Sequence, residues 1–341
     1  MDLGERKRYI LKAIVDDYIE TAEPVGSRTI AKKYEMGISS ATIRNEMADL
    51  EELGYLEQPH TSAGRIPSDK GYRYYVDKLI NIKDPTPEEA SEIKNILQFA
   101  TICEIDNIIK RTTKLLSEVT RYTAAVLSPS VKKSAVKSIQ LVQVNDYDVL
   151  AIVVTDTAVI KHVLIKLPRR IDYDTLLKIN NMLNEKLRNL TVEQIDLSVI
   201  NQILMELRGY YEILNAIIPV LYDSLKSVDC DIYLEGTTNI FKYPEYNDIN
   251  KAKNFLSLLE RKETLIDIFS DDGENLKVSI GKENNNDEVR DCSIIRASYM
   301  VGNKVVGTIG VIGPTRMDYS KVIGILKFIA DNLNDILRNS F

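Results

Sequence analysis

Two groups of polar side chains stand close together near the N-terminal end of the chain. The first begins at Ser39 and includes Ser40, Thr42, Arg44 and Asn45. An asparagine can pair with N6 and N7 of adenine, an arginine with O6 and N7 of guanine, and a hydroxyl group with several base edges. These residue types suit the reading of DNA bases, and the candidates for that contact are Ser40, Thr42, Arg44 and Asn45.

The second group lies in the segment HTSAGR, residues 60–65. Hydroxyl and guanidinium groups bind phosphate oxygens, an arginine can also enter the minor groove, and a glycine allows a loop to approach closely. Ser27 and Arg28 offer the same chemistry earlier in the chain. The candidates for contact with the DNA backbone are Ser27, Arg28, His60, Thr61, Ser62, Gly64 and Arg65.

Helices must position these groups, and the spacing of apolar residues predicts where the helices lie. Residues 5–21 carry apolar side chains at helical spacing, and Pro24 and Gly26 end that segment. Ser27 is a suitable N-cap for a second, short helix, which Gly37 ends. The first group of polar residues then begins a third helix.

This third helix is capped by Ser39 or Ser40 and should have one buried and one exposed side. Its apolar stripe contains Ile43, Met47, Leu50 and Leu53. Its later half holds most of its acids, namely Glu46, Asp49, Glu51 and Glu52. Because acids repel phosphates, we expect the helix to enter the major groove by its N-terminal end, as recognition helices do.

The order of these elements is that of a winged helix-turn-helix. After the third helix come residues 55–57, the loop 60–65 and then Ile66, and the loop would be the wing. We place this domain at residues 1–80. Three-helix domains with charged surfaces also bind proteins instead of DNA, and the pattern alone leaves that alternative open.

The charge of the chain argues against non-specific coating of nucleic acid. Its 341 residues contain 44 Lys and Arg and 50 Asp and Glu, so the net charge is −6. Any contact with DNA must therefore be local. Between positions 27 and 44, a single acid, Glu35, faces the four basic residues Arg28, Lys32, Lys33 and Arg44.

The chain beyond residue 80 begins with a polar linker. Pro85 and Pro87 mark it at residues 81–90. A helical region then runs to about Thr123. Its apolar stripe is typical of ordinary core, although in a dimeric protein it could also contact the partner.

Strands are predicted in two separate parts of the chain. Residues 138–168 are typical of a three-stranded meander, and helices follow to residue 226. The C-terminal part returns to three strands and a final helix from about Tyr319 to Arg338. The two sets could form one antiparallel sheet with residues 190–271 inserted, or the meander could belong to the inserted part.

Two segments, EPVGSRTIAKKY and SSATIRNEMADLEELGYLEQPHTSAGRIPSDKGYRYYVD, together resemble the HrcA family of bacterial heat-inducible transcription repressors. The match runs nearly unbroken from Pro24 to Asp77, and its part HTSAGRIPSDKGYRYYVD is highly specific. The resemblance implies a homodimeric repressor of groE- and dnaK-type chaperone operons, which binds double-stranded DNA at the CIRCE inverted repeat. It also implies that a GroEL-type chaperonin helps to maintain the active fold.

The same resemblance implies an α+β multidomain fold: an N-terminal winged helix, a GAF-like antiparallel sheet domain, and an α/β dimerisation domain inserted into it. The expected winged helix spans residues 1–80 and the linker 81–90. The GAF-like domain is expected in two parts, 91–189 and 272–341, on either side of an insertion at 190–271.

Residues suited to catalysis or metal binding are scarce. The only histidines, His60 and His162, lack cysteine or carboxylate partners at metal spacing. The three cysteines, Cys103, Cys230 and Cys292, are far apart and are typical of free thiols in a reducing cytoplasm. We therefore expect no enzyme, cofactor or metal. A membrane span needs about 20 consecutive apolar residues, and none is predicted.

Two other functions can be weighed against a dimeric repressor. A metabolite-responsive regulator would bind an effector in the GAF-like domain, although we find no ligand signature there. The glycines at 307, 310 and 313 are spaced G-x-x-G-x-x-G within a strand, which differs from a phosphate-binding loop. An enzyme with a fused winged helix is the third alternative, and the shortage of histidines argues against it.

Overall fold

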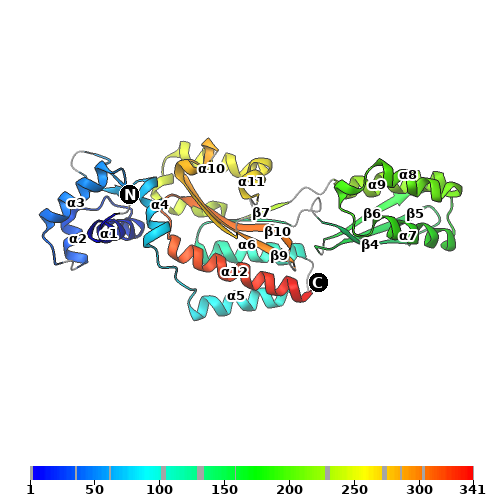
Figure 1. The fold of residues 1–341 in the computed structure, drawn as a ribbon, viewed down its shortest axis with the longest axis horizontal. Coiled ribbons are helices and arrows are strands. Elements are labelled where there is room, and N and C mark those ends of the chain that lie inside the picture. The colour runs from blue at the N-terminus through cyan, green and yellow to red at the C-terminus, as the bar shows by residue number, and fades with distance from the viewer. Residues whose placement is uncertain are drawn as a thin grey trace.

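A computed structural model shows three units in a row, with the N-terminal unit at one end and a separate α/β unit at the other (Figure 1). The structure describes residues 3–34, 37–60, 63–100, 105–128, 134–157, 159–226, 231–270, 275–284, 286–301 and 304–340.

The N-terminal unit is a winged helix, as predicted. Its helices are α1 (Glu5–Thr21), α2 (Ser27–Lys33) and α3 (Ser40–Glu52), and strands β1 (Leu56–Glu57) and β2 (Ile66–Pro67) form an antiparallel pair. Val25 joins this pair through two backbone hydrogen bonds of 2.9 Å with Arg65. Helix α4 (Asp69–Tyr74) and the π-helix η1 (Tyr75–Leu79) lead out of the unit.

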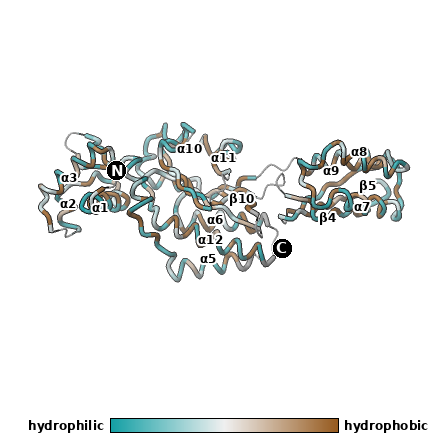
Figure 2. The backbone as a smooth tube through the Cα atoms, viewed as in Figure 1, coloured by the Kyte–Doolittle hydropathy of each residue, from teal (hydrophilic) through white to brown (hydrophobic). Residues whose placement is uncertain are grey.

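The core of this unit forms where the apolar sides of α1 and α3 meet. Ile14, Ile43 and Leu50 are fully buried there. Leu53, expected on the same stripe, is 41% exposed, because α3 ends at Glu52 and Leu53 is its C-cap residue. In the other two units, hydrophobic residues likewise lie on the strands and at intervals along the helices (Figure 2).

The predicted linker is shorter than expected and is packed against the final helix α12 (Tyr319–Ser340). The Lys83 N–H donates to the carbonyl of Ser320 at 3.3 Å, and the Ser320 hydroxyl donates to the carbonyl of Asn81. A Cβ added to Gly324 would lie 1.8 Å from the Lys83 carbonyl oxygen. Since α5 already begins at Pro87, residues 87–90 are helical and do not belong to the linker.

The central unit is built on a five-stranded antiparallel sheet in the order β7-β3-β10-β9-β8. Its strands are β3 (Thr123–Leu127), β7 (Ile232–Glu235), β8 (Leu276–Ile280), β9 (Cys292–Val301) and β10 (Lys304–Pro314). Helices α5 (Pro87–Ala100), α6 (Ile105–Thr120) and α12 lie on one side (Figure 1). Helices α10 (Ile249–Glu260) and α11 (Lys262–Phe269) lie on the other. Alternate residues of β3 enter the two cores, with Val126 on the α6 side and Ala125 on the α11 side.

The third unit is a three-stranded antiparallel sheet covered on one face by helices. Its strands, in the order β4-β5-β6, are β4 (Val136–Gln143), β5 (Asp148–Thr155) and β6 (Ile160–Lys166). Its helices are α7 (Tyr173–Leu187), α8 (Leu197–Glu206) and α9 (Tyr211–Lys226). These elements share a hydrophobic core of their own.

This arrangement corrects the expected domain boundaries. The chain leaves the central sheet after β3 and returns to it at β7, so the third unit is inserted between them and includes the meander. The expected boundary at residue 190 divides this unit, and the single sheet joining the meander to the C-terminal strands does not form. The prediction failed because β3 and β7 are short, and no strand was predicted at either place. The helical region was expected to run to about Thr123, whereas α6 stops at Thr120.

Several short helical turns complete the described part of the chain. They are η3 (Val192–Gln194), η4 (Arg208–Tyr210), η5 (Thr237–Lys242), η6 (Pro244–Tyr246), η7 (Gly281–Glu283) and η8 (Asp287–Val289). Within the described ranges, no helix is long and apolar enough to cross a membrane.

Candidate nucleic-acid interface

Helix α3 is fixed at its N-terminal end by Ser39. The Ser39 Oγ accepts the N–H of Thr42 at 3.1 Å and lies 3.0 Å from the Thr42 hydroxyl. This is an N-cap, which satisfies one of the free N–H groups at a helix start. Of the two serines considered, Ser39 is therefore the cap, and Ser40 is the first helical residue.

The candidates for base contact differ in how they are presented. Arg44 and Asn45 are exposed, whereas Ser40 and Thr42 are half-buried. The Thr42 hydroxyl is also engaged with Ser39. The structure thus brings Arg44 and Asn45 to the open side of the first turns of α3, where a major groove can meet them.

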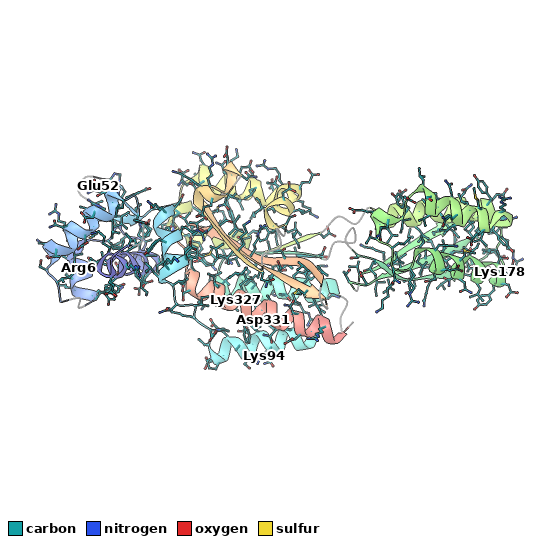
Figure 3. The ribbon with its side chains drawn as sticks, in the orientation of Figure 1. Arg6, Glu52, Lys94, Lys178, Lys327 and Asp331 are labelled. Atoms are coloured by element: carbon teal, nitrogen blue, oxygen red, sulfur yellow. The ribbon has the colours of Figure 1, made fainter. Side chains whose placement is uncertain are left out.

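Cations from α1 cover part of the acidic half of α3. Lys7 Nζ lies 2.7 Å from Glu46 and 2.8 Å from Asp49, and Arg6 lies 3.3 Å from Glu46. Hydrogen bonds to Asp49 and Glu46 raise the pKa of Lys7. These acids therefore anchor α3 on α1, while Glu52 at the far end of α3 lies at the surface (Figure 3).

The wing is held against the protein by Gly64. A Cβ at this position would lie 2.5 Å from the carbonyl oxygen of Val25 and 2.6 Å from that of Pro24. The close approach predicted for Gly64 is therefore made to the protein's own backbone. His60 is exposed, and Thr61 and Ser62 lie outside the described residues.

Arg65 makes a contact that the sequence did not predict. Its Nε donates to Glu51 Oε2 at 2.7 Å, and its side chain is only 20% exposed. The guanidinium thus ties the base of the wing to α3. A phosphate contact by Arg65 would have to share this cation with Glu51.

The basic segment before α3 is smaller than its sequence indicates. Lys33 pairs with Asp17 at 2.7 Å and with Glu20 at 2.6 Å, and these hydrogen bonds raise the pKa of Lys33. Among the described residues, no ion pair forms at Arg28, Lys32 or Arg44, and all three are exposed. These three cations remain available to phosphates around the N-terminal end of α3.

Ser27 is not the N-cap that was predicted for the second helix. The N-cap of α2 is Gly26, and Ser27 is the first residue of the helix, half-buried beside the exposed Arg28. Its hydroxyl is therefore not used as a cap and lies at the N-terminal end of α2. Backbone N–H groups at a helix start favour phosphate, so Ser27 lies where a phosphate of the DNA backbone could be bound.

Polar side chains that line one cavity in the described part of the chain already have partners. No group of three or more His, Cys, Asp and Glu side chains in that part of the chain could hold a metal ion. A cavity of about 390 Å³ between α11 and the edge of the sheet is lined in part by Asn284 and Arg296. Both donate to backbone carbonyls, Asn284 to Gly281, Val289 and Cys292, and Arg296 to Ile268.

Comparison with known proteins matches nearly the whole chain to one family. Residues 2–79 match the family described as "Winged helix-turn-helix transcription repressor, HrcA DNA-binding", and residues 106–323 match "HrcA protein C terminal domain". A heat-inducible transcription repressor HrcA of Clostridium perfringens (strain 13 / Type A) is 52% identical over 338 residues, covering 99% of each chain. A protein of the same description from Clostridium botulinum (strain Eklund 17B / Type B) is 50% identical, again over 99% of each.

One solved structure shares the overall fold. It is described as a hypothetical protein at 2.2 Å resolution, is 23% identical, and aligns with a TM-score of 0.62 over 100% of both chains. At this identity the likeness supports the three-unit architecture alone.

Proposed function

Because the chain belongs to the HrcA family of heat-inducible transcription repressors, we propose that it binds the CIRCE inverted repeat as a homodimer and so represses chaperone operons. It would act in the cytoplasm, on double-stranded DNA. Its DNA-binding part is the N-terminal winged helix.

The observation that carries this proposal is the exposed start of α3. Arg44 and Asn45 lie there with no competing acid partner among the described residues, and the unpaired cations Arg28 and Lys32 stand on the neighbouring helix. Asn45 and Arg44 would contact base edges, with Ser40 and Thr42 beside them. Ser27, Arg28 and the wing residues His60, Thr61, Ser62, Gly64 and Arg65 would hold the phosphates.

The open face of the inserted sheet supports a homodimer. On this face Leu150 pairs with Leu164, and Val154 with Ile160. Leu164 is 53% exposed and Ile160 54%, because the helices of this unit cover the opposite face. A contiguous apolar patch is uncommon on a monomer, and a second copy of the same face would cover it. We therefore assign the inserted unit the role of a dimerisation domain.

A dimer explains the need for an inverted repeat. Two recognition helices related by two-fold symmetry reach half-sites about 34 Å apart, or a multiple of that distance. The central five-stranded sheet, which we take to be GAF-like, would connect each winged helix to the dimer contact.

We further propose that a GroEL-type chaperonin maintains the active fold, so that heat releases repression when free chaperonin runs short. Before two copies pair, the exposed apolar side chains on the inserted unit, such as Leu164, are the kind of surface that a chaperonin binds. Operator affinity should fall after heating and recover when chaperonin is added. Unchanged affinity after heating without chaperonin would refute this part.

The DNA-binding proposal is tested by fluorescence anisotropy with a labelled CIRCE-type duplex and the same duplex with one half-site scrambled, at several salt concentrations. Tight binding that collapses when one half-site is lost is the expected result. Equal, weak and steeply salt-dependent binding to both duplexes would contradict it.

A further inference from the structure

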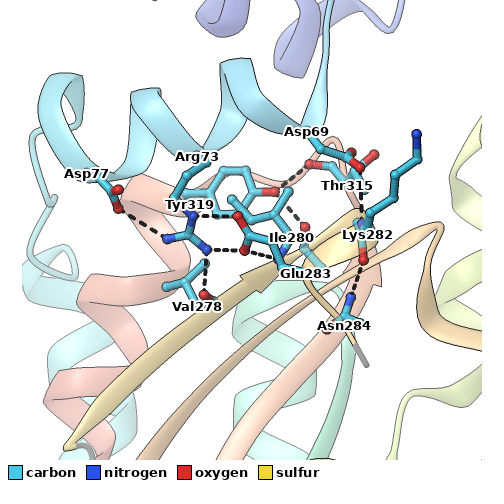
Figure 4. A network of polar contacts seen from close by, with 12 residues as sticks. Asp69, Arg73, Asp77, Val278, Ile280, Lys282, Glu283, Asn284, Thr315 and Tyr319 are labelled. Carbon is cyan, nitrogen blue, oxygen red and sulfur yellow. Dashed lines mark hydrogen bonds and ion pairs between the residues drawn. The ribbon is translucent and has the colours of Figure 1, made fainter. Parts of the chain in front are cut away.

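The winged helix is not loosely tethered to the central unit, because an arginine of α4 reaches across the junction. Arg73 Nε donates to Glu283 Oε1 at 2.7 Å, and its Nη2 pairs with the other oxygen of the same carboxylate (Figure 4). Nη2 also donates to the Val278 carbonyl at 2.6 Å. Two parallel hydrogen bonds of this kind fix the orientation of the guanidinium on the carboxylate as well as the distance between them.

The start of α4 docks on the same turn of the central unit. The Asp69 carboxylate accepts the N–H of Lys282 at 3.1 Å (Figure 4). Beside it, Gly281 has a φ of +54°, and an added Cβ there would lie 2.3 Å from the Asp69 carboxylate. The glycine thus lets the backbone meet Asp69 directly.

A second arginine, on the central unit, holds the winged helix at α1. Arg316, in the turn before α12, has a side chain only 9% exposed, and its Nε donates to Glu245 at 2.6 Å. Its Nη1 donates to the carbonyl of Ile19, in the last turn of α1, at 2.6 Å. A buried guanidinium needs such partners, because an unpaired buried charge is costly.

Aromatic packing adds to the junction. The rings of Tyr72 in α4 and Tyr319 in α12 lie 5.8 Å apart, and both are almost fully buried. Together with the linker packed on α12, these contacts hold the winged helix in the orientation seen on the central unit. Helix α3 lies on the far side of the winged helix from this junction (Figure 1).

We propose that Arg73 and Arg316 are positioning residues, which set the angle of each winged helix and thereby the half-site spacing that the dimer accepts. This inference rests on the proposed function. The two arginines would act through the orientation of α3 and touch no DNA. A dimer with a loose junction would still read each half-site, but it would tolerate repeats of the wrong spacing.

The test uses the full chain with changes confined to the central unit. The variant Glu245→Gln/Arg316→Met/Glu283→Gln removes both ionic contacts, replacing the buried pair by neutral side chains of similar size. Glu283→Gln alone is the milder variant. The matched control is Asp146→Asn, which removes an exposed ion pair of 3.3 Å with Arg170 in the inserted unit.

Anisotropy is measured on three duplexes: the inverted repeat, the repeat with five base pairs added to its spacer, and a single half-site. Five base pairs turn one half-site by about half a helical turn, so the wild type and the control should bind the lengthened duplex roughly 100-fold more weakly. For the triple variant, the ratio of the affinity for the original repeat to the affinity for the lengthened repeat should fall below about fivefold. Its affinity for the single half-site should change less than about twofold. Glu283→Gln should give an intermediate ratio.

Two results would overturn the inference. If the variants keep the full preference for the original spacing, the junction does not set it. If the half-site affinity is lost as well, these contacts stabilise the winged helix itself and do not position it. Failure of the proposed function would look different, because the wild type would then show no preference for two half-sites over one.

Discussion

Glu51 of helix α3 and Arg65 of the wing form an ion pair, with 2.7 Å between Glu51 Oε2 and Arg65 Nε. An acidic residue of α3 thus holds the arginine of the wing. The two elements that should meet DNA are coupled before DNA arrives. The available cations lie on α2 and at the start of α3.

The first prediction concerns phosphate contacts. Arg28 is exposed and carries no ion pair within the described residues, so Arg28→Ala should reduce the slope of log affinity against log salt by about 0.9 for each winged helix, or about 1.8 for a dimer on the inverted repeat. Arg65→Ala should weaken binding to all sequences alike, with a smaller change in slope, since its cation is already paired with Glu51. Salt-dependent anisotropy titrations measure both slopes. If Arg65→Ala lowered the slope by a full unit for each winged helix and Arg28→Ala left it unchanged, the main phosphate contact would be made by the wing and not by α2.

The second prediction concerns base recognition. Asn45→Ala should cost about 1–3 kcal/mol of binding free energy and relax the preference at one base position in each half-site. The measurement is anisotropy on the operator and on duplexes with single base changes. Asn201→Ala, an exposed asparagine on helix α8, is the matched control and should change nothing. Intact base preference in Asn45→Ala would mean that α3 is oriented differently on DNA.

The third prediction concerns the wing. A Cβ at Gly64 would lie 2.5 Å from the Val25 carbonyl oxygen, so Gly64→Ala should break the contact between the wing and Val25 and destabilise the winged helix by about 1–3 kcal/mol. Gly209→Ala is the control, because nothing lies within 4 Å of a Cβ there. Thermal unfolding should show a lower midpoint for the first variant only. Equal unfolding midpoints for Gly64→Ala and Gly209→Ala would show that the wing can shift without loss of stability.

The fourth prediction concerns the dimer contact. Leu164→Glu places a charge on the open face of the inserted sheet and should shift the protein toward monomer in sedimentation equilibrium. Leu197→Glu, on the helical side of the same unit, is the control, since Leu197 is 76% exposed. A dimer that survives Leu164→Glu but dissociates with Leu197→Glu would place the contact on the helices.

Local features of the chain were predictable and distant pairings were not. The helix at 5–21 matches α1, because its apolar spacing and the Pro24 and Gly26 that follow are all local signals. The cap at Ser39 follows from the same kind of signal. The pairing of β3 with β7 joins segments more than 100 residues apart, and neither is long enough to show a period of its own.

The same distinction applies to the site. Exposure of Arg44 and Asn45 follows from the helical period of α3, which the sequence contains. The partners of Arg65 and Lys33 depend on how the wing and α2 pack, so the sequence overestimated the free positive charge. The contacts of Arg73 and Arg316 could not be predicted from the sequence, because their partners Glu283 and Ile19 lie 210 and 297 residues away.

The most direct test of the central claim is a hydroxyl-radical footprint of the protein on a CIRCE-type duplex. Two winged helices of one dimer should protect two backbone regions on the same face of the DNA, separated by about 34 Å or a multiple of it. Scrambling one half-site should remove both protected regions at protein concentrations that protect the intact repeat. A single continuous footprint, or protection of one half-site that ignores the other, would contradict the account.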